Sequence, residues 1–384
     1  MKKKILVITG SRAEYGLLRP LLKFLKSDYL IDLKIIATGS HLSVDHGLTY
    51  REIEADGFDI CHKVEILASD DSPVGAASAF GRAVSGIGPA VNTIKPDLVV
   101  VLGDRFEILA AVCAVSMLGI PIAHIHGGEI TNGSKDDSLR HAITKLSHIH
   151  FVSAEPYRQR VIQMGECPDR VFTVGGLGVD VISTTELLSR AELEEVIGYK
   201  FLEQNLLVTF HPDTLKYDEN ERQVYALLDA LSRFPNVGMI FTKANADAGG
   251  RLVNDFIEDF VNSMSNAVIF DSLGSKNYLS CMALVDGLVG NSSSAILEAP
   301  TFKKPAVNIG DRQNGRLMST SIINCTVEAE DIYLAIETLF SNEFQIRAKT
   351  AVNPYGESGA SLRICALIQD LKLNNLLIKH FYDL

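Results

Sequence analysis

Short apolar runs alternate along this chain with longer stretches that have a helical pattern. Each run ends at a glycine, a serine or a charged residue. The runs of the first half span residues 4–10, 33–39, 97–104, 121–128, 148–154 and 171–176, and those of the second half span 206–212, 237–245, 267–272, 287–294 and 305–312. Near-continuous apolar runs are typical of strands buried on both faces. We therefore predict parallel sheets with helices on either side.

The number of runs and the length of the chain predict two domains. A chain of 384 residues is too long for one ordinary hydrophobic core and fits two domains of roughly 150 to 200 residues each. The glycine-rich segment 175–180 lies between the two sets of runs, and we interpret it as a hinge. The pattern therefore predicts an α/β protein with two doubly wound, Rossmann-like domains in tandem.

Polar residues gather directly after the predicted strands. They occupy residues 11–16, 103–105, 124–129, 211–212 and 291–294. Ligands of open parallel sheets bind beyond the carboxyl ends of the strands, where loops and helix N-termini offer unpaired N–H groups. We expect two such faces to enclose one ligand in an interdomain cleft.

Composition narrows the classes of protein. With 36 Lys and Arg against 47 Asp and Glu, the net charge is −11, which argues against nucleic-acid binding by general phosphate attraction. No apolar run reaches the roughly 18 residues that span a bilayer, and the basic N-terminus leads straight into a predicted strand. The six cysteines have no CxxC spacing, as expected of reduced thiols. We expect a cytoplasmic protein without membrane or nucleic-acid partners.

The stretch HIHGGE, residues 124–129, is compatible with a metal site, an acid/base site or the end of a buried strand. The ligand types that a zinc or manganese site needs are present nearby, namely His124, His126, Glu129, Asp136 and His141. His124 and His126 would alternate along a strand and point the same way, and the spacing offers no obvious set that completes a ligand shell. We therefore expect no metal. For His148 and His150 the buried, structural interpretation is favoured.

The segment NSSSAILE, residues 291–298, places three hydroxyls and several N–H groups at the start of a predicted helix. Such an arrangement suits a phosphate or diphosphate, and it equally suits an ordinary serine N-cap. His211 follows another strand and is either a phosphate donor or a structural hydrogen-bonding group. The segment GSRAEYG lacks the middle glycine of the dinucleotide fingerprint, so it does not indicate a nicotinamide site.

The order of these motifs resembles a known family. GSRAEYG, GDR, HIHGGE, DDSLRHAITKLSHIHF, HP, NADAG, GNSSS and NIGDRQNGR are very similar to the motifs of the hydrolysing UDP-N-acetylglucosamine 2-epimerases of bacterial sialic acid synthesis. The likeness covers nearly the whole chain. It implies a glycosyltransferase-B-type fold, with an N-terminal domain at 1–179, a UDP-binding domain at 180–365 and a C-terminal helix at 366–384 that crosses back onto the first domain.

The resemblance also implies a reaction. UDP-N-acetylglucosamine and water would give N-acetylmannosamine and UDP, without a metal or another cofactor, in a pathway to capsule or surface polysaccharide. Sister enzymes act on UDP-2,4-diacetamido-2,4,6-trideoxyhexoses of legionaminic acid synthesis, so the family does not decide the substituent at C4. Relatives are dimers or tetramers, which implies a homo-oligomer.

The chemistry of that class needs proton-transfer groups near C1 and C2 of the sugar. Loss of UDP from C1 makes loss of the C2 proton feasible and leaves a 2-acetamidoglucal, which water then rehydrates with inversion at C2. The resemblance implies Asp104 and Asp136 as acid/base carboxylates. Other epimerases have a glutamate at the position of His126, and this chain has Glu129 three residues later. The proton-transfer role of His126 or of Glu129 stays open.

For the nucleotide we expect contacts from several residues. Those of the second domain are His211, Asn245, Ser275, Tyr278, Ser292, Ser293 and Glu298, of which Glu298 would reach the ribose hydroxyls. Arg12 and Arg316 are the expected diphosphate cations. Three other functions stay open: a retaining glycosyltransferase, a non-catalytic nucleotide-sugar sensor and a non-hydrolysing epimerase.

Overall fold

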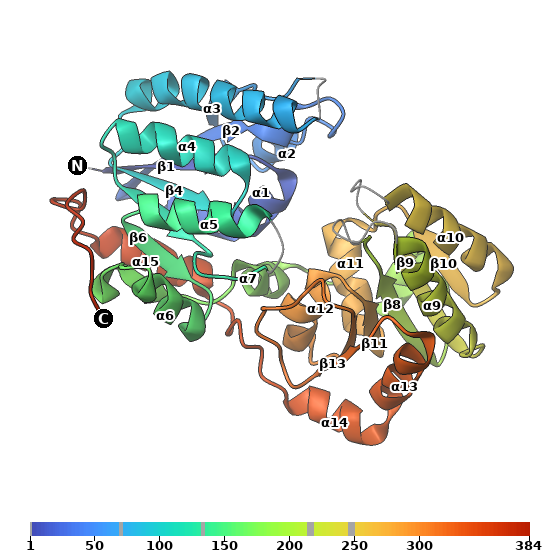
Figure 1. Cartoon of the computed structure of the whole chain (residues 1–384). Helices are drawn as coiled ribbons and strands as arrows, with labels where there is room; N and C mark the ends of the chain where they lie inside the picture. Colours follow the sequence, from blue (N-terminus) through green and yellow to red (C-terminus); the bar gives the residue numbers. More distant parts are fainter. Residues whose placement is uncertain (1, 69–71, 132–134, 213–218, 245–249) are drawn as a thin grey trace. The chain divides into compact units, whose positions relative to one another are not determined.

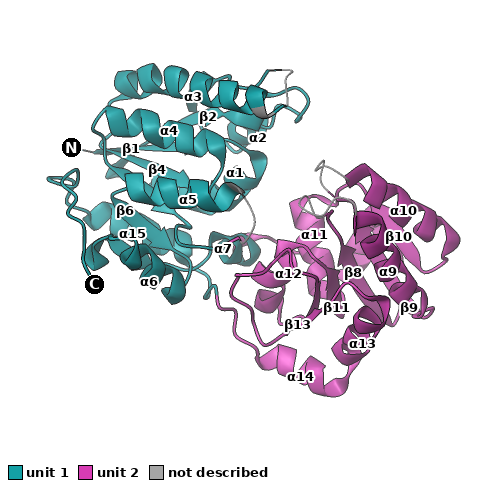
Figure 2. Cartoon of the chain, in the orientation of Figure 1, with its two compact units in different colours: residues 1–130, 134–183, 355–384 teal, residues 131–133, 184–354 magenta. Residues whose placement is uncertain are grey.

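Two parallel β-sheets, each in its own structural unit, organise the chain. The computed structural model describes residues 2–68, 72–131, 135–212, 219–244 and 250–384 (Figure 1). Unit 1 comprises residues 1–130, 134–183 and 355–384, and unit 2 comprises residues 131–133 and 184–354 (Figure 2). Every described strand pair is parallel, so the predicted α/β class with two parallel sheets is confirmed.

The sheet of unit 1 has seven described strands in the order β3-β2-β1-β4-β5-β6-β7. The strands are β1 (Lys3–Thr9), β2 (Ile31–Thr38), β3 (Ile60–Val64), β4 (Leu98–Leu102), β5 (Ile122–Ile125), β6 (Ile149–Val152) and β7 (Val171–Thr173). The helices are α1 (Arg12–Ser27), α2 (Tyr50–Ala55), α3 (Pro73–Ile94), α4 (Phe106–Met117), α5 (Lys135–Leu146), α6 (Glu155–Gln163), α7 (Leu177–Thr184) and α15 (Ala360–Asp370), with the short 3-10 helices η1 (Gly39–Leu42) and η2 (Pro168–Arg170). The order reverses direction after β1, at the point where β1 pairs with both β2 and β4.

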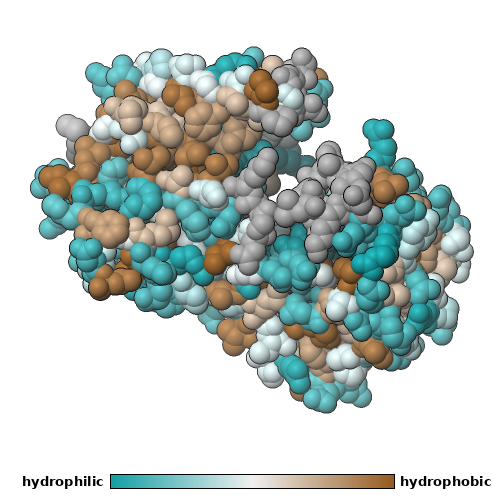
Figure 3. Space-filling model, in the orientation of Figure 1, coloured by the Kyte–Doolittle hydropathy of each residue, from teal (hydrophilic) through white to brown (hydrophobic). Residues whose placement is uncertain are grey.

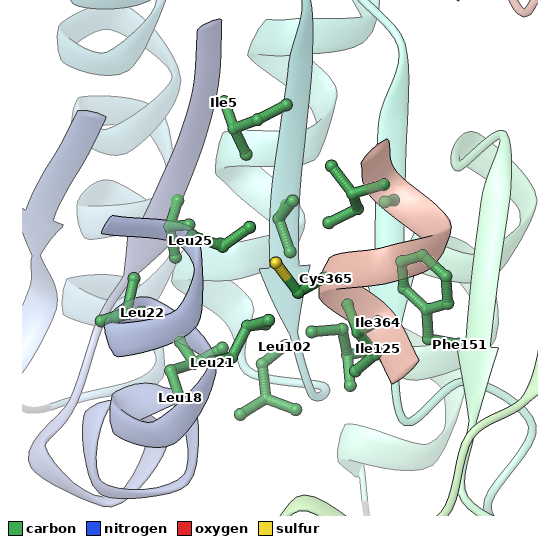
Figure 4. Close-up of a cluster of buried hydrophobic side chains, with 14 of the residues drawn as sticks. Ile5, Leu18, Leu21, Leu22, Leu25, Leu102, Ile125, Phe151, Ile364 and Cys365 are labelled. Carbon is green, nitrogen blue, oxygen red and sulfur yellow. The ribbon is translucent and has the colours of Figure 1, made fainter. Parts of the chain in front are cut away.

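Alternate residues of β1 contribute to two different cores. Ile5 and Val7 belong to the cluster formed with α1 and α15, whereas Leu6 and Ile8 belong to the cluster formed with α3 and α4. Figure 4 shows the first cluster, in which Leu18, Leu21 and other leucines of α1 lie beside Ile364 and Cys365 of α15. Both faces of the strand are buried, which explains why its sequence has no polar alternation.

The sheet of unit 2 has six described strands in the order β10-β9-β8-β11-β12-β13. The strands are β8 (Gln204–Thr209), β9 (Val237–Thr242), β10 (Ala267–Phe270), β11 (Gly287–Gly290), β12 (Ala306–Ile309) and β13 (Ile322–Cys325). The helices are α8 (Arg190–Ile197), α9 (Asn220–Ser232), α10 (Gly250–Ser263), α11 (Gly274–Leu284), α12 (Ser293–Leu297), α13 (Ala329–Phe340) and α14 (Asn342–Thr350), with the 3-10 helix η4 (Ala299–Phe302). Leu206 and Val208 face α9, α10 and α13, and Leu207 between them faces α8, α11 and α12.

Two strands, β3 and β13, lie outside the apolar runs that the sequence pattern predicted. Each is the last strand at one edge of its sheet. Their side chains are half-buried or exposed, and β3 has the mixed sequence ICHKV. Edge strands have less apolar surface to cover, so they need no continuous apolar run.

The last helix is α15 at Ala360–Asp370, so the predicted helix over 366–384 is wrong in its bounds. The carboxylate of Asp180 accepts hydrogen bonds from the backbone N–H groups of Gly359, Ala360 and Ser361, which places the start of the helix. Beyond the helix, Asn375 has a φ of 66°, a left-handed conformation that interrupts helical geometry. The helix does pack on the sheet of unit 1.

A buried carboxylate anchors the segment after α15. Glu166 is 2% exposed and accepts from Lys145 at 2.6 Å, from Lys379 of the terminal segment at 2.9 Å and from His150 at 3.0 Å. The Lys379 ammonium also donates to the carbonyl oxygens of Lys145 and Ser147. Burial opposes ionisation of Glu166, but the hydrogen bonds from His150, Lys145 and Lys379 outweigh it and lower the pKa of the carboxyl to about 2.

This shift predicts an acid-dependent loss of stability. The pKa of Glu166 is about 2 in the folded protein against an ordinary value of 4.5, so its contribution is complete above about pH 4.5 and falls as the pH drops toward 2. We expect Glu166→Gln to be much less stable than wild type at pH 5.5, and the difference to shrink at pH 3.5. Urea unfolding at both pH values measures the difference in stability between the variant and wild type. Glu343→Gln, at a side chain that is 86% exposed, is the control. An equal difference at both pH values would contradict the prediction.

Apolar side chains also reach the surface of unit 1. Figure 3 shows hydrophobic residues gathered over α3 and α4. Exposed apolar side chains of these helices include Val74, in the first turn of α3 and 72% exposed, and Met117, the last residue of α4 and 82% exposed. Exposed apolar surface of this kind is typical of a contact with another protein. Among the described helices, none is both long enough and apolar enough to cross a membrane.

Candidate active site

The predicted acid/base residues of unit 1 lie after neighbouring strands, as expected from the sheet order. Asp104 follows β4, His126 follows β5, and Asp136 lies in the first turn of α5. Gly103 has a φ of 85°, and this turn directs the chain from β4 to Asp104. The carboxyl ends of adjacent parallel strands meet at one edge of the sheet, so these residues share one side of unit 1.

Arg140 of α5 connects the segments that carry these residues. Its side chain is 4% exposed, and its guanidinium forms an ion pair with Asp104 and another, at 3.0 Å, with Asp137. It also donates to the backbone carbonyl of Glu129 at 2.9 Å. One buried cation thus joins α5, the loop after β4 and the loop after β5. The sequence analysis assigned no role to Arg140, although this residue lies in the recognised motif DDSLRHAITKLSHIHF.

His126 and Glu129 lie together. The Nδ1 atom of His126 is 3.3 Å from Oε1 of Glu129, and the same carboxylate oxygen accepts from the hydroxyl of Ser153 at 2.9 Å. Nε2 of His126 accepts from the backbone N–H of Leu177 at 3.3 Å. A neutral ring that accepts at Nε2 carries its proton on Nδ1, which therefore points to Glu129.

The expectation that His124 and His126 point the same way is wrong. Strand β5 ends at Ile125, and His126 has a φ of 66°, so it does not follow the alternation of the strand. His124 is fully buried, and its Nε2 lies 2.7 Å from the carbonyl oxygen of Gly103. Burial lowers its pKa to about 3, so the ring is neutral and donates through Nε2 to the turn that holds Asp104.

The structure places the remaining histidines of this region in structural roles. His150 is fully buried beside Glu166, and His148 accepts from the backbone N–H of Ile122. Both are buried, in agreement with the interpretation from sequence. Within the described ranges, no three His, Cys, Asp or Glu side chains are grouped as metal ligands would be.

Asp136 has the electrostatics of a proton carrier. Its pKa is raised, first by desolvation and then by the negative charge of Asp104, while Arg105 and Arg140 act in the opposite direction. A carboxyl group whose pKa is raised keeps its proton to higher pH, which suits it to proton exchange with a substrate. Arg12, by contrast, has a side chain 60% exposed and forms an ion pair with Glu52 at 2.9 Å.

In unit 2 the ends of β8 and β11 lie side by side. The side-chain oxygen of Asn291 accepts from the backbone N–H of His211 at 2.7 Å, and its amide group donates to the His211 carbonyl at 2.8 Å. Gly290, with a φ of 141°, allows this contact, because a Cβ there would lie 1.9 Å from the carbonyl oxygen of Thr209. The Asn291 carbonyl in turn accepts from Gln313 at 2.8 Å. The Asn291 side chain thus binds both the N–H and the carbonyl group of the predicted residue His211.

The serine-rich segment forms a helix start, as predicted. Ser292 is the N-cap of the short helix α12, and its hydroxyl oxygen accepts from the backbone N–H of Ser294 at 3.4 Å. Ser293 is the first residue of that helix. The phenol of Tyr278 lies within hydrogen-bonding distance of the Ser294 hydroxyl, and Glu298 ends the helix. Burial raises the pKa of Glu298 to about 7.

The other predicted nucleotide contacts are less closely grouped. Ser275 is an exposed residue of α11, on the same helix as Tyr278. Arg316 lies in the turn after β12, and its backbone N–H donates to the carbonyl of Gln313. Asn245 lies outside the residues that the structure describes. Tyr278, Ser292, Ser293 and Glu298 therefore form one group around α12 in unit 2.

Some residues of these groups received no role from sequence. Asn291 was noted only as one of the polar residues 291–294, and Ser153 was not singled out, although it too directly follows a strand. Gln313 lies in the motif NIGDRQNGR, which was recognised without assigning that residue a role. No local signal identifies the hydrogen-bonding role of His124, because it depends on contacts with a neighbouring strand and with α5.

Comparison with known proteins shows extensive similarity. The family model described as UDP-N-acetylglucosamine 2-epimerase matches residues 23–369. The chain is 41% identical to the GDP/UDP-N,N'-diacetylbacillosamine 2-epimerase (hydrolyzing) of Campylobacter jejuni, with all of both chains covered. It is 37% identical to the polysialic acid biosynthesis protein P7 of Escherichia coli, covering 100% of this chain and 98% of that protein. It is 35% identical to the UDP-N,N'-diacetylbacillosamine 2-epimerase (hydrolyzing) of Legionella pneumophila, covering 98% of each.

Solved structures share the fold. The crystal structure of UDP-GlcNAc 2-epimerase from Neisseria meningitidis bound to UDP-GlcNAc superposes with a TM-score of 0.76 at 18% identity, covering 96% of this chain and 100% of that chain. At this identity the likeness concerns the fold alone. The predicted glycosyltransferase-B-like arrangement of two Rossmann-like sheets is confirmed at that level.

Proposed function

This chain belongs to the UDP-N-acetylglucosamine 2-epimerase family, and we propose that it is a hydrolysing UDP-sugar 2-epimerase whose substrate is UDP-N,N'-diacetylbacillosamine. The observation that carries the choice of substrate is the similarity, over nearly the full length of both chains, to the two hydrolysing diacetylbacillosamine epimerases. The proposal replaces UDP-N-acetylglucosamine as the preferred substrate expected from the motifs.

The proposed reaction has two stages. In the first, the bond from C1 to the UDP oxygen breaks, the proton on C2 passes to a base, and a C1=C2 double bond forms. In the second, the oxygen of a water molecule bonds to C1 and a proton is delivered to the opposite face of C2, which inverts that centre. The free 2-epimeric sugar and UDP are the products. Each stage requires one group that accepts a proton and one that donates a proton or binds the diphosphate.

Unit 1 supplies the proton-transfer groups in this proposal. Asp104 and Asp136 have unequal electrostatic surroundings, which suits one as acid and the other as base. His126 exchanges a proton at Nε2 once that atom gives up its hydrogen bond from the N–H of Leu177, and its Nδ1–H faces Glu129, whose carboxylate holds the tautomer. Glu129 is thus the partner of His126.

Unit 2 binds the UDP part in this proposal. The N–H groups and hydroxyls of Ser292 and Ser293, with His211, hold the diphosphate, while Glu298 accepts from the ribose hydroxyls. Arg12 and Arg316 contribute positive charge to the diphosphate. Asn245, Ser275 and Tyr278 stay as proposed contacts of the uridine and the sugar.

The role of Glu298 predicts how UDP affinity depends on pH. Its pKa of about 7 means that the carboxyl is protonated below that pH and ionised above it. Only the ionised form accepts from both ribose hydroxyls, so UDP should bind about tenfold more tightly at pH 8 than at pH 6. Calorimetric titration with UDP measures this. Glu298→Gln should bind weakly at both values, and a variant that keeps the wild-type pH dependence would contradict the assignment.

One experiment tests the proposed function. Purified protein is incubated in heavy water, with a chelator present, with UDP-N,N'-diacetylbacillosamine, its GDP-linked form or UDP-N-acetylglucosamine. We expect release of the nucleoside diphosphate, UDP or, from the GDP-linked form, GDP, and of a free 2-epimeric sugar carrying deuterium at C2, with the highest kcat/KM for UDP-N,N'-diacetylbacillosamine. A nucleotide-linked epimer as product would instead assign a non-hydrolysing epimerase, and sugar transfer to an acceptor would assign a glycosyltransferase. Absence of turnover with all three substrates would overturn the proposal.

UDP-N-acetylglucosamine is the second candidate substrate. The description of the matching family and the similarity to protein P7 of polysialic acid biosynthesis favour it. The two substrates differ at C4 and C6 of the sugar, so the ratio of their kcat/KM values decides between them.

We also propose a homo-oligomer that uses the apolar surface over α3 and α4. A charge at the most exposed apolar position there should weaken such a contact, because burying an unpaired carboxylate is costly. We expect Met117→Asp to shift the mass measured by light scattering toward the monomer, whereas Val352→Asp, at a residue 75% exposed in unit 2, should leave it unchanged. An unchanged mass for Met117→Asp would exclude this surface.

A further inference from the structure

Two buried glutamates meet at the end of β1 and have no role in the reaction described above. Glu14, in the first turn of α1, is 7% exposed, and Glu107, in the first turn of α4, is 1% exposed. The backbone N–H of Gly10 donates to Oε2 of Glu14 at 2.7 Å. A Cβ placed on Gly10 would lie 2.6 Å from Cγ of Glu107. Both carboxyl groups therefore lie against the same glycine.

Each of these carboxyl groups has an oxygen with an unmet hydrogen bond. Within the described part of the chain, Oε1 of Glu14 and Oε2 of Glu107 are buried and accept no hydrogen bond. Two ionised carboxylates buried against one glycine would repel each other, and each would lose its hydration. A proton on one of them removes the repulsion and creates the missing donor.

We propose that Glu14 and Glu107 share one proton, held on Oε1 of Glu14 and donated to Oε2 of Glu107, and that the single negative charge left on the pair positions Arg105 next to Asp104. Nε of Arg105 donates to Oε1 of Glu107 at 2.5 Å. Arg105 directly follows Asp104 in the chain, so holding its side chain constrains the backbone of the proposed acid/base residue. Glu14, Glu107 and Arg105 are positioning residues, and their role rests on the proposed function of Asp104 and Asp136.

The charges around Glu14 agree with a bound proton at neutral pH. Burial, and next the negative charge of Glu107, raise the pKa of Glu14 to about 8. The N–H of Gly10 and the charge of Arg105 oppose the shift, and Asp104 adds to it. From η1, His41 adds no charge at neutral pH, because burial lowers its pKa to about 4. The remaining cation at the start of α1, Arg12, is paired with Glu52.

Loss of this proton would change the proton-transfer site. Above about pH 8 the proton on Glu14 leaves to solvent, and the pair then carries two negative charges against the one positive charge of Arg105. Arg105 is among the groups that lower the pKa of Asp136, whereas nearby negative charge raises it. Drawing Arg105 toward a doubly charged pair therefore raises the proton affinity of Asp136 and slows the step in which it must be ionised.

Infrared spectroscopy of protein labelled with carbon-13 in the glutamate side-chain carboxyl tests the shared proton directly and needs no substrate. We expect wild type to lose a protonated-carboxyl band between pH 7 and pH 9.5. The part of that loss with a midpoint near pH 8 should be absent from Glu14→Gln and unchanged in Glu54→Gln, whose carboxylate pairs with Lys63 at the surface. The part with a midpoint near pH 7, from Glu298, should remain in all three proteins. A loss with a midpoint near pH 8 in Glu14→Gln would overturn the proposal.

A second variant covers the case in which Glu14→Gln does not fold. In Glu107→Gln the like charge beside Glu14 is gone, so the midpoint of the Glu14 band should move to lower pH. An unchanged pH midpoint of the Glu14 band in Glu107→Gln would overturn the proposal that the two glutamates share a proton.

The pH profile of turnover tests the positioning role. We expect kcat of wild type and of Glu54→Gln to fall by roughly threefold to tenfold through the midpoint of the Glu14 band, and we expect Glu14→Gln to lack this step. The same step in Glu14→Gln would overturn the positioning role. If the proposed function were wrong, the protein would have no turnover with UDP-sugars, yet the infrared titration would still report on the proton.

Discussion

Replacing Asp104 by asparagine is expected to lower kcat by about two to four orders of magnitude, the range typical of a lost acid/base group. The side chain keeps its size and one acceptor oxygen for Arg140, so the arrangement around the guanidinium is retained while the ability to exchange a proton is lost. KM should change little, because Asp104 is assigned no contact with UDP. Steady-state release of UDP measures both constants.

Asp137 provides the matched control for this prediction. Its carboxylate pairs with the same guanidinium, at 3.0 Å, and it has a similar side-chain exposure of 26% against 28% for Asp104. Asp137→Asn therefore removes the same kind of charge from the same cation. We expect its kcat to stay within about threefold of wild type, given the small effect of partly exposed ion pairs. If kcat fell equally in Asp104→Asn and Asp137→Asn, turnover would depend on the ion pairs of Arg140 and not on Asp104 in particular.

Replacing Arg140 by alanine is expected to lower the free energy of unfolding by about 3 kcal/mol or more. The guanidinium is 4% exposed and serves Asp104, Asp137 and the carbonyl of Glu129, all of which would lose their donor together. The substitution removes a buried side chain with its packing, and it leaves two partly exposed carboxylates and one backbone carbonyl without this donor. Urea denaturation followed by circular dichroism gives the free energy.

Arg158→Ala is the control for the loss of Arg140. Arg158 also donates to two backbone carbonyls, those of Val171 and Pro168, and pairs with Glu155, but its side chain is 27% exposed. Water can replace the hydrogen bonds of Arg158, so we expect Arg158→Ala to lower the free energy of unfolding by about 1 kcal/mol. If the two substitutions destabilised the protein equally, burial of Arg140 would not be the cause of its importance.

The predicted positions of most strands are in agreement with the structure, because burial on both faces leaves a strand few polar residues. Lys3–Thr9 and Val237–Thr242 show this pattern in full. Edge strands such as Ile60–Val64 do not have a continuous apolar sequence, since one of their sides faces solvent. The helix at Ala360–Asp370 was misplaced for a different reason: the Asp180 carboxylate that caps it lies about 180 residues away in sequence.

For the candidate site, too, the sequence predicts some features and leaves others to the tertiary structure. That Asp104, His126 and Ser292 follow strands can be read from the sequence, because the runs before them end there. The direction of each side chain cannot be predicted from the sequence. At His126, for example, a left-handed φ interrupts the alternation of β5 and directs the side chain toward Glu129. No spacing rule predicts that turn.

By itself, then, the sequence of this protein determined the two parallel sheets and the polar residues at the ends of their strands, since hydrophobic burial and chain direction act locally. The tertiary structure alone decided which charges meet: Arg140 with Asp104, and Glu14 with Glu107 at Gly10. The physical reason is that a proton affinity depends on desolvation and on neighbouring charge, and both are set by segments that are far apart in the chain.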